Sequence, residues 1–240
     1  MLPLTTERHG RFVVVRDDLL PGGTKQRSLE GLCAGAGELV YAGPPWGMAA
    51  LCLARIGQRT GQRVTLFYAA RASLCPRQVL AKQAGAHLEL VRPGYLTVVR
   101  ARAREYCDRT GARLMAWGGG DAAVKAIAEA AAEARRRSPE VTEVWCAAGS
   151  GTLAKGLRLG FGLPVHVVEV GHALTPEERT GLASITRHPL DFEQRTTAAV
   201  PFPSCRHYDA KAWELAQRRA TGCPLFWNVA PDHAGSGVRP

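Results

Sequence analysis

The chain has 240 residues, of which 46% are hydrophobic and 22% charged, as in globular domains that bury a sizeable core. Its net charge of +10 fits either a polyanionic partner or an arginine-rich, solvated surface. No stretch resembles a transmembrane helix or the apolar part of a signal peptide. The seven cysteines form no Cys-x-x-Cys pair and the histidines show no metal-binding spacing. We therefore expect a cytoplasmic protein with reduced thiols and no metal site.

Short apolar runs alternate with helical patterns along the chain. This alternation predicts an α/β fold with parallel sheets covered by helices. The predicted strands cover residues 11–16, 38–42, 63–69, 87–91, 113–116, 142–147 and 164–170. The predicted helices cover residues 25–35, 46–60, 76–84, 96–110, 119–137, 150–160 and 207–221, and residues 231–240 are expected to form a loose tail.

Lys25 follows the first predicted strand and a turn of small residues, Pro21-Gly22-Gly23-Thr24. It stands at the start of an amphipathic segment. A partly desolvated lysine amine loses its proton readily and becomes nucleophilic, so this position is compatible with covalent catalysis. The alternative is an ordinary exposed lysine at the start of a helix.

A glycine-containing turn, Gly149-Ser150-Gly151-Thr152, follows the buried strand predicted at 142–147 and precedes a helix. Glycines allow an anion to approach the backbone closely, and the amides at a helix N-terminus bind phosphate. The hydroxyl groups of Ser150 and Thr152 can add two donors. The sequence therefore predicts a phosphate site here, and an ordinary turn is the alternative.

The segment Arg16–Glu30 resembles the lysine segment of fold-type-II pyridoxal-phosphate (PLP) enzymes, especially the D-cysteine desulfhydrase and ACC deaminase group. The usual form in that group is Arg-Asp-Asp, a spacer, then Gly-Asn-Lys-x-Arg-Lys-Leu-Glu. Here Thr24 replaces the Asn and Ser28 replaces the second basic residue. The turn at 149–152 resembles the Gly-Ser-Gly-Gly-Thr phosphate loop of the same enzymes, without their second consecutive glycine.

Two further segments resemble this group, and the likeness runs in order from about Arg16 to Gly171. Trp117-Gly118-Gly119-Gly120-Asp121 is similar to a Gly-Gly-Ser-Asn stretch that precedes a helix, and Leu80–Ala86 is similar to a Leu-Gly-Ala turn. The remainder matches poorly, which indicates a shortened and diverged member of the group.

The resemblance implies a tryptophan synthase beta-like fold of two parallel-sheet lobes, with PLP in the cleft between them. Residues 1–35 and 119–240 would form the larger, PLP-binding lobe and residues 36–118 the smaller lobe. Lys25 would carry PLP as a Schiff base, with Thr24 beside the cofactor, and the loop of Gly149, Ser150, Gly151 and Thr152 would hold its phosphate.

Two regions depart from the family pattern. Relatives hold the substrate carboxylate with a Gln-Ser-Asn-His loop, whereas this chain has Gly43-Pro44-Pro45-Trp46-Gly47-Met48. Trp46 would either stack on the cofactor or a base, or pack as an ordinary aromatic residue. The family's C-terminal signature, Pro-Val-Tyr-Thr-Gly-Lys, is placed at Pro224–Asn228, where the tyrosine is absent. Three residues are candidates to contact the pyridine nitrogen: Asn228, Ser204 and Thr197.

The resemblance implies a PLP-dependent lyase or decarboxylase that acts on an amino-acid group. The arginine surplus, including Arg100, Arg104 and Arg135–Arg137, favours a substrate on an anionic carrier, as do the lost carboxylate loop and Trp46. Small PLP enzymes of bacteriophages trim glycine-derived groups on modified thymines in DNA, and this basic chain is similar to them in size and charge. The specific hypothesis is therefore an amino-acid-modified thymine in phage DNA, acted on in the host cytoplasm.

Other functions stay open at this point. The first alternative is a deaminase or desulfhydrase of free amino acids such as D-cysteine or ACC. The second is a non-catalytic PLP-fold protein that binds nucleic acid. A Rossmann dehydrogenase ranks last, because no Gly-x-Gly-x-x-Gly follows the first strand. In each case we expect no membrane partner, and a homodimer is the expected assembly.

Overall fold

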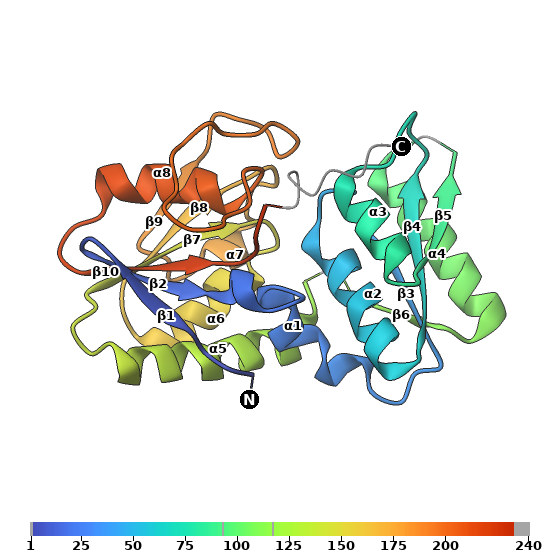
Figure 1. The fold of residues 1–240 in the computed structure, drawn as a ribbon, viewed down its shortest axis with the longest axis horizontal. Helices are drawn as coiled ribbons and strands as arrows, with labels where there is room; N and C mark the ends of the chain where they lie inside the picture. Colours follow the sequence, from blue (N-terminus) through green and yellow to red (C-terminus); the bar gives the residue numbers. More distant parts are fainter. Residues whose placement is uncertain (1, 93, 117, 233–240) are drawn as a thin grey trace. The chain divides into compact units, whose positions relative to one another are not determined.

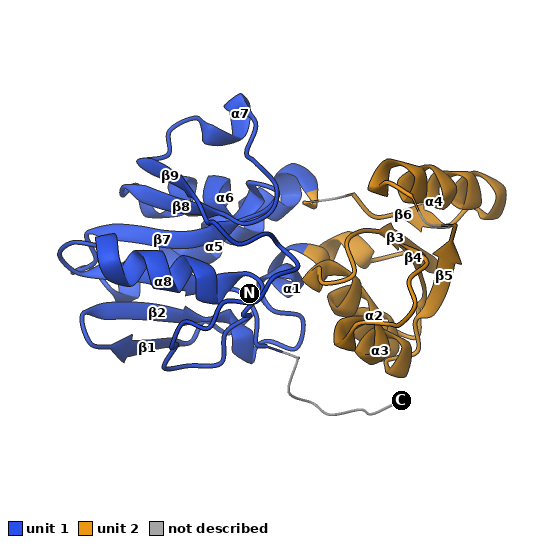
Figure 2. Ribbon diagram, turned by 90° about the horizontal axis from the view of Figure 1, so that it is seen from above, with its two compact units in different colours: residues 1–28, 120–232 blue, residues 29–119, 233–240 orange. Residues whose placement is uncertain are grey.

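The computed structural model of the chain (Figure 1) describes residues 2–92, 94–116 and 118–232. Trp117, part of one predicted motif, and most of the predicted tail lie outside the described residues. The chain forms two compact units, coloured in Figure 2. The larger unit combines residues up to Ser28 with Gly120–Asp232, and the smaller contains Leu29–Gly119. Residues 29–35, which the sequence analysis assigned to the larger lobe, group with the smaller unit.

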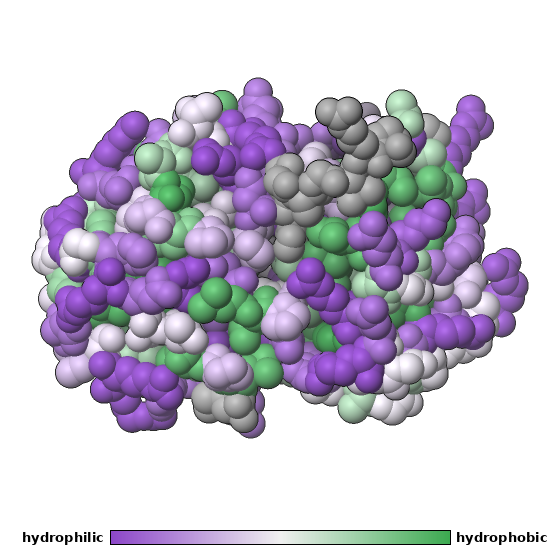
Figure 3. All heavy atoms as spheres, viewed as in Figure 1, coloured by the Kyte–Doolittle hydropathy of each residue, from purple (hydrophilic) through white to green (hydrophobic). Residues whose placement is uncertain are grey.

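The face of the molecule seen in Figure 3 is mainly polar. Figure 3 shows hydrophilic residues spread over the viewed face of each unit, with smaller apolar patches between them. Among the described helices, none has both the length and the apolar character that a membrane crossing requires.

The larger unit is built on a six-stranded sheet. The edge strand nearest the N-terminus of the chain pairs antiparallel with its neighbour, and all other neighbouring strands pair parallel. Three of these strands, β1 (Thr6–His9), β9 (Ser184–Arg187) and β10 (Pro224–Asn228), were not among the predicted strands. In spatial order the strands are β1 (Thr6–His9), β2 (Phe12–Arg16), β10 (Pro224–Asn228), β7 (Glu143–Ala148), β8 (Val165–Glu169) and β9 (Ser184–Arg187).

Helices cover both faces of this sheet (Figure 1). The alanine-rich α5 (Gly120–Arg137) packs along α6 (Thr152–Phe161) on one face. The other face is covered by α8 (Asp209–Arg219). Shorter helices connect the strands: η1 (Asp17–Leu19) and α1 (Thr24–Leu29) follow β2, and α7 (Pro176–Arg179) follows β8.

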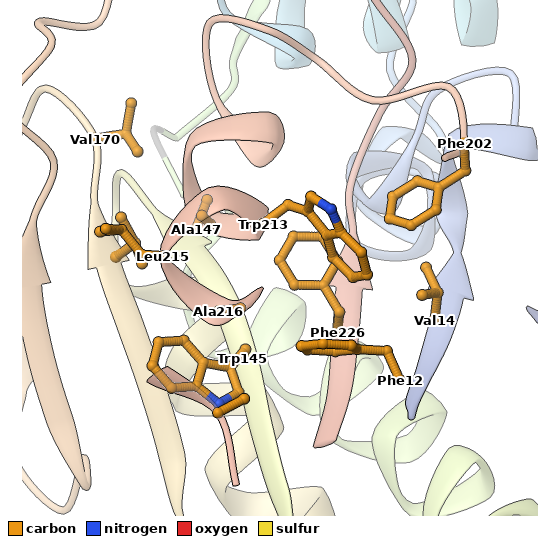
Figure 4. Close-up of a cluster of buried hydrophobic side chains, with 13 residues drawn as sticks. Phe12, Val14, Trp145, Ala147, Val170, Phe202, Trp213, Leu215, Ala216 and Phe226 are labelled. Atoms are coloured by element: carbon orange, nitrogen blue, oxygen red, sulfur yellow. The ribbon is translucent and has the colours of Figure 1, made fainter. Parts of the chain in front are cut away.

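The core of the larger unit lies between α8 and the sheet. Trp213 of α8 is buried among aromatic rings, as Figure 4 shows. Its ring centroid lies 4.6 Å from that of Phe12, 4.9 Å from Phe202 and 5.2 Å from Phe226. These contacts attach α8 to β2 and to the central strand β10, and so hold the strand that precedes Lys25 in the sheet.

The smaller unit is a four-stranded parallel sheet with helices on both sides (Figure 2). Its strands and its three α-helices match the predicted elements closely, whereas the end of the predicted helix 25–35 is the 3₁₀ turn η2 (Gly31–Cys33). In spatial order the strands are β5 (His87–Val91), β4 (Arg63–Ala69), β3 (Glu38–Ala42) and β6 (Arg113–Leu114). The helices are α2 (Met48–Thr60), α3 (Pro76–Gln83) and α4 (Leu96–Thr110).

Candidate active site

The candidate site lies at the carboxyl edge of the larger sheet. Lys25 follows β2, the loop 149–152 follows β7, and β10 runs parallel between these two strands. Neighbouring strands are about 4.8 Å apart, so β2 and β7 are separated by roughly 10 Å. Ligands of open α/β sheets bind outside the carboxyl ends of the strands. The fold thus brings the two predicted motifs to one edge of one sheet.

The turn before Lys25 is fixed against the end of β10. Gly23 has φ +61°, and a Cβ atom there would lie 2.4 Å from the carbonyl oxygen of Val229. The amide of Thr24 donates a hydrogen bond to the same oxygen, at 2.9 Å. Because only glycine tolerates both this conformation and this approach, the turn requires Gly23. Lys25 itself is half-buried.

A buried carboxylate, Asp17, contacts the residue before Lys25. The Thr24 hydroxyl donates to Asp17 Oδ2 at 2.7 Å, and the indole N–H of Trp227 donates to both of these oxygens at 3.0 Å. Arg27 forms an ion pair with Asp17 at 2.6 Å. The Thr24 hydroxyl therefore has protein partners on both sides, and a contact between Thr24 and the cofactor stays a prediction.

The neighbouring carboxylate, Asp18, ties β2 to β10. Arg16 binds Asp18 at 2.8 Å, and the Asn228 side-chain amide donates to Asp18 Oδ1 at 2.7 Å and to the carbonyl oxygen of Pro203 at 2.8 Å. Within the described residues, Asn228 Oδ1 and Ser204 Oγ are buried and lack a hydrogen-bond partner. Buried polar atoms are rarely left unsatisfied, so this edge of the sheet suits a polar ligand. The third predicted candidate, Thr197, is exposed in a loop.

The loop 149–152 has the form of an anion site. Gly151 adopts φ +68° at the N-cap of the ten-residue helix α6. The first amides of a helix have no acceptor within it, and they attract anions together with the helix dipole. The hydroxyl groups of Ser150 and Thr152 lie 3.1 Å apart at this end. A Cβ on Gly151 would lie 3.0 Å from carbon atoms of Glu178, which is a second reason for glycine there.

Two residues beside this loop were missed from the sequence. Tyr208 hydrogen-bonds to the main chain of Gly149 through its hydroxyl group, whose pKa is raised well above the usual range by burial. It therefore stays a neutral hydroxyl at neutral pH. The adjacent Asp209 is fully buried and accepts a hydrogen bond from the amide of Ala230 at 3.2 Å. Both residues stand at the start of α8, at the same edge as Lys25.

A sequence signal for Tyr208 was present. Tyr208 and Lys211 have the Tyr-x-x-Lys spacing of the C-terminal family signature, which the sequence analysis placed instead at Pro224–Asn228. That segment is the fully buried strand β10.

The loop Gly43–Met48 belongs to the smaller unit, where it follows β3. Its carbonyl groups are held from α3: the Cys75 thiol donates to the Pro45 oxygen at 3.2 Å, and Arg77 donates to the Trp46 oxygen. Trp46 is half-buried. Because Lys25 and the loop 149–152 are in the other unit, stacking of Trp46 on the cofactor stays a prediction.

Several arginines proposed to contact phosphates have partners within the protein. Arg135 donates to the carbonyl oxygens of Pro139 and Val141, and Arg136 and Arg137 both bind Glu133. These contacts cap and brace the end of α5. On α4, Arg104 is exposed and Arg100 is half-buried. Part of the excess of basic residues thus forms hydrogen bonds and ion pairs within the protein.

No protein-family model matches the chain, and a search of curated proteins also finds no match. Solved structures do match. An ACC deaminase homologue has a TM-score of 0.77 and 18% identity, over 92% of this chain and 84% of its own. A T.th. threonine deaminase has a TM-score of 0.73 and 16% identity, over 99% and 94%. Escherichia coli diaminopropionate ammonia lyase in its apo form has a TM-score of 0.70 and 16% identity, over 96% and 82%.

The fold is therefore that of fold-type-II PLP enzymes, with parallel sheets in both units, and the predicted fold class is confirmed. At these identities the likeness concerns the fold alone.

Proposed function

We propose that the chain is a PLP-dependent enzyme that acts on an amino-acid group. One observation carries the proposal: a lysine and a glycine-containing anion loop flank the central strand β10 at the carboxyl edge of a fold-type-II sheet. The helix N-terminus at Gly151, the hydroxyl groups of Ser150 and Thr152, and the unsatisfied polar atoms of Ser204 and Asn228 fit a planar, phosphorylated ligand. PLP, when bound, supplies an electron sink for the bond that breaks at the substrate's α carbon.

Lys25 has two roles in this proposal. Its amine anchors the cofactor covalently, and after the substrate's amine takes that position it can move a proton at the substrate's α carbon. The amides of the first turn of α6 and the hydroxyl groups of Ser150 and Thr152 hold the phosphate, and the neutral hydroxyl of Tyr208 borders the same loop. We propose a lyase or decarboxylase among the reactions that these roles allow.

Removal of two hydroxyl groups tests the phosphate loop. PLP should bind the wild-type protein, produce visible absorbance and become fixed to the protein by borohydride. The variant Ser150→Ala/Thr152→Val should bind PLP at least about 100-fold more weakly, because two hydrogen bonds to a charged group contribute roughly 1.5–3 kcal/mol each and 1.4 kcal/mol is a factor of about ten in affinity. The measurement is a spectroscopic titration with PLP.

Thr110→Val is a matched control, because its hydroxyl group bonds to Tyr106 in the smaller unit. This variant should bind PLP like the wild type. A folded double variant with wild-type affinity would place the phosphate elsewhere. Gly151 is unsuitable for this test, since its positive φ and the contact with Glu178 would mix strain with lost affinity.

As the finer hypothesis, we propose that the amino-acid group is carried on DNA, as a glycine-derived modification of thymine. Two observations support a carrier of this kind. The net charge is +10, and the loop at 43–48 has no hydroxyl, amide or charged side chain to hold a free carboxylate. Arg100 and Arg104, one turn apart on α4, would contact backbone phosphates, which orient a strand without reading its sequence.

Salt dependence tests this hypothesis. On duplex DNA each neutralised phosphate adds about 0.9 to the slope of log affinity against log salt. The variant Arg100→Ala/Arg104→Ala should therefore flatten the slope by roughly 1.8 and leave PLP absorbance unchanged. Arg59→Ala/Arg218→Ala is the control, because it removes the same charge at two exposed arginines outside the predicted set of phosphate contacts.

A product assay complements the binding measurement. The enzyme is incubated with amino-acid-modified DNA and, separately, with D-cysteine, D-serine and ACC, and products are followed by mass. Fast turnover of a free amino acid without DNA binding at low salt would favour the deaminase or desulfhydrase alternative. Binding of PLP and DNA without any turnover would favour a non-catalytic protein.

A further inference from the structure

Asp17 is contacted by residues that precede and follow Lys25 in the sequence. Its carboxylate accepts hydrogen bonds from the Thr24 hydroxyl, the Trp227 indole and, through two nitrogen atoms, the Arg27 guanidinium. All of these side chains are buried. We call Asp17, Thr24 and Trp227 the Asp17 cluster; Arg27 adds the ion pair that completes the carboxylate's contacts.

Helical geometry explains why this cluster bears on Lys25. Thr24 and Arg27 are three residues apart in α1, so their side chains share one face of the helix, and that face meets Asp17. Lys25 is rotated by about 100° from Thr24, away from this face. The contacts with Asp17 therefore fix the rotation of the first turn about its axis, and with it the direction of the lysine side chain.

The cluster also couples the lysine turn to the central strand. Trp227 lies in β10, and alternation along a strand directs it to the face opposite Phe226 and the α8 core. There its N–H reaches both Asp17 and Thr24. The Thr24 amide bonds to Val229, which directly follows the same strand. These contacts thus fix the position of Lys25 relative to β10, the strand that runs between the lysine and the anion loop.

We propose that the Asp17 cluster is a positioning site that directs the Lys25 amine toward the cofactor's aldehyde carbon. This inference rests on the proposed PLP function and adds a role that these residues perform through their contacts with one another. Thr24 supports it most directly, because its hydroxyl donates to Asp17 and accepts from Trp227. The single hydroxyl proton is then committed to the protein, so Thr24 acts on the reaction through its neighbour.

The test separates the direction of the lysine from the binding of the cofactor. PLP reports covalent attachment, followed as the rate of rise of visible absorbance and as borohydride-trapped mass. The analogue 4′-deoxypyridoxine 5′-phosphate lacks the aldehyde and reports non-covalent binding alone. Thr24→Val removes the hydroxyl group at nearly constant volume, and Thr24→Ser restores it. Trp227→Phe removes the indole N–H, and Trp213→Phe is its control, since the Trp213 N–H has no partner among the described residues.

Attachment should be about 10- to 100-fold slower in Thr24→Val and in Trp227→Phe, because small misplacements of a reacting group can cost two orders of magnitude. Thr24→Ser and Trp213→Phe should stay within about threefold of the wild type by the same argument. Affinity for the deoxy analogue should be unchanged in all four. If either Thr24→Val or Trp227→Phe fails to fold, as judged by circular dichroism, the attachment rate of the other variant tests the inference.

Two results would overturn the inference while the proposed function stands. One is wild-type attachment rates in Thr24→Val and Trp227→Phe. The other is a loss of analogue affinity equal to the loss of attachment, which would make the cluster part of the binding site as a whole. If the wild-type protein binds the analogue but never attaches PLP, both the inference and the proposed function fail.

Discussion

Replacement of Lys25 by alanine is expected to abolish covalent attachment of PLP. The absorbance band of the covalently attached cofactor should disappear, and borohydride should leave no label on the protein. Binding of the deoxy analogue should persist, because the loop 149–152 is a separate part of the site. The fold should be retained, since Lys25 is half-buried at a turn that Gly23 and Thr24 hold in place.

Lys155→Ala is the matched control for this experiment. Lys155 lies on α6, close in sequence to the anion loop, and its side chain binds Asp121 on the surface. This variant should take up PLP and be labelled like the wild type. If the label appears in Lys25→Ala and is lost in Lys155→Ala, the anchoring lysine has been assigned wrongly. Peptide mass mapping of the labelled wild type gives the same answer independently.

Replacement of Trp213 by alanine is expected to cause the largest loss of stability. The side chain is almost fully buried and contacts Phe12, Phe202 and Phe226 (Figure 4). Truncation of a buried tryptophan lowers the free energy of unfolding by about 3–5 kcal/mol, since it removes apolar burial and leaves a cavity. The measurement is urea denaturation followed by far-ultraviolet circular dichroism.

Trp213→Phe separates packing from hydrogen bonding. Because the indole N–H has no partner among the described residues, this change removes volume and no described hydrogen bond. The expected loss is roughly 1–2 kcal/mol, well below that of alanine. Equal losses for the two variants would show that the N–H has an essential partner, such as a bound water, and that packing is not the main term.

The parts of the site that were predictable from sequence are local. The turn before Lys25 and the loop 149–152 can be recognised in the sequence, because each has small residues between a predicted strand and a predicted helix. Regular alternation likewise predicted most strands and helices of both units. Parallel sheets follow from that alternation, because each helix returns the chain to the same edge.

The parts that were missed depend on contacts between distant residues. Strand β10 contains a proline and an asparagine and has no neighbouring hairpin, so only its pairing with β2 and β7 makes it the central strand. The same strand brings Trp227 to Asp17 and Thr24. No local pattern indicates that the Thr24 hydroxyl would be held by these partners. Trp46 lies in the other unit, so its predicted role is untested.

The order of the strands has a consequence for synthesis on the ribosome. Among the described residues, the smaller unit is the single segment Leu29–Gly119. In contrast, β2 and the turn that presents Lys25 can pair with β10 only after it has been synthesised, nearly two hundred residues later. Non-local strand pairs form late because the intervening loop must first be closed. The nascent chain should therefore acquire a folded smaller unit well before its lysine turn is locked. In a chain truncated before β10, the turn that carries Lys25 would lack its contacts with that strand. Covalent attachment of the cofactor would therefore indicate that the sheet is complete.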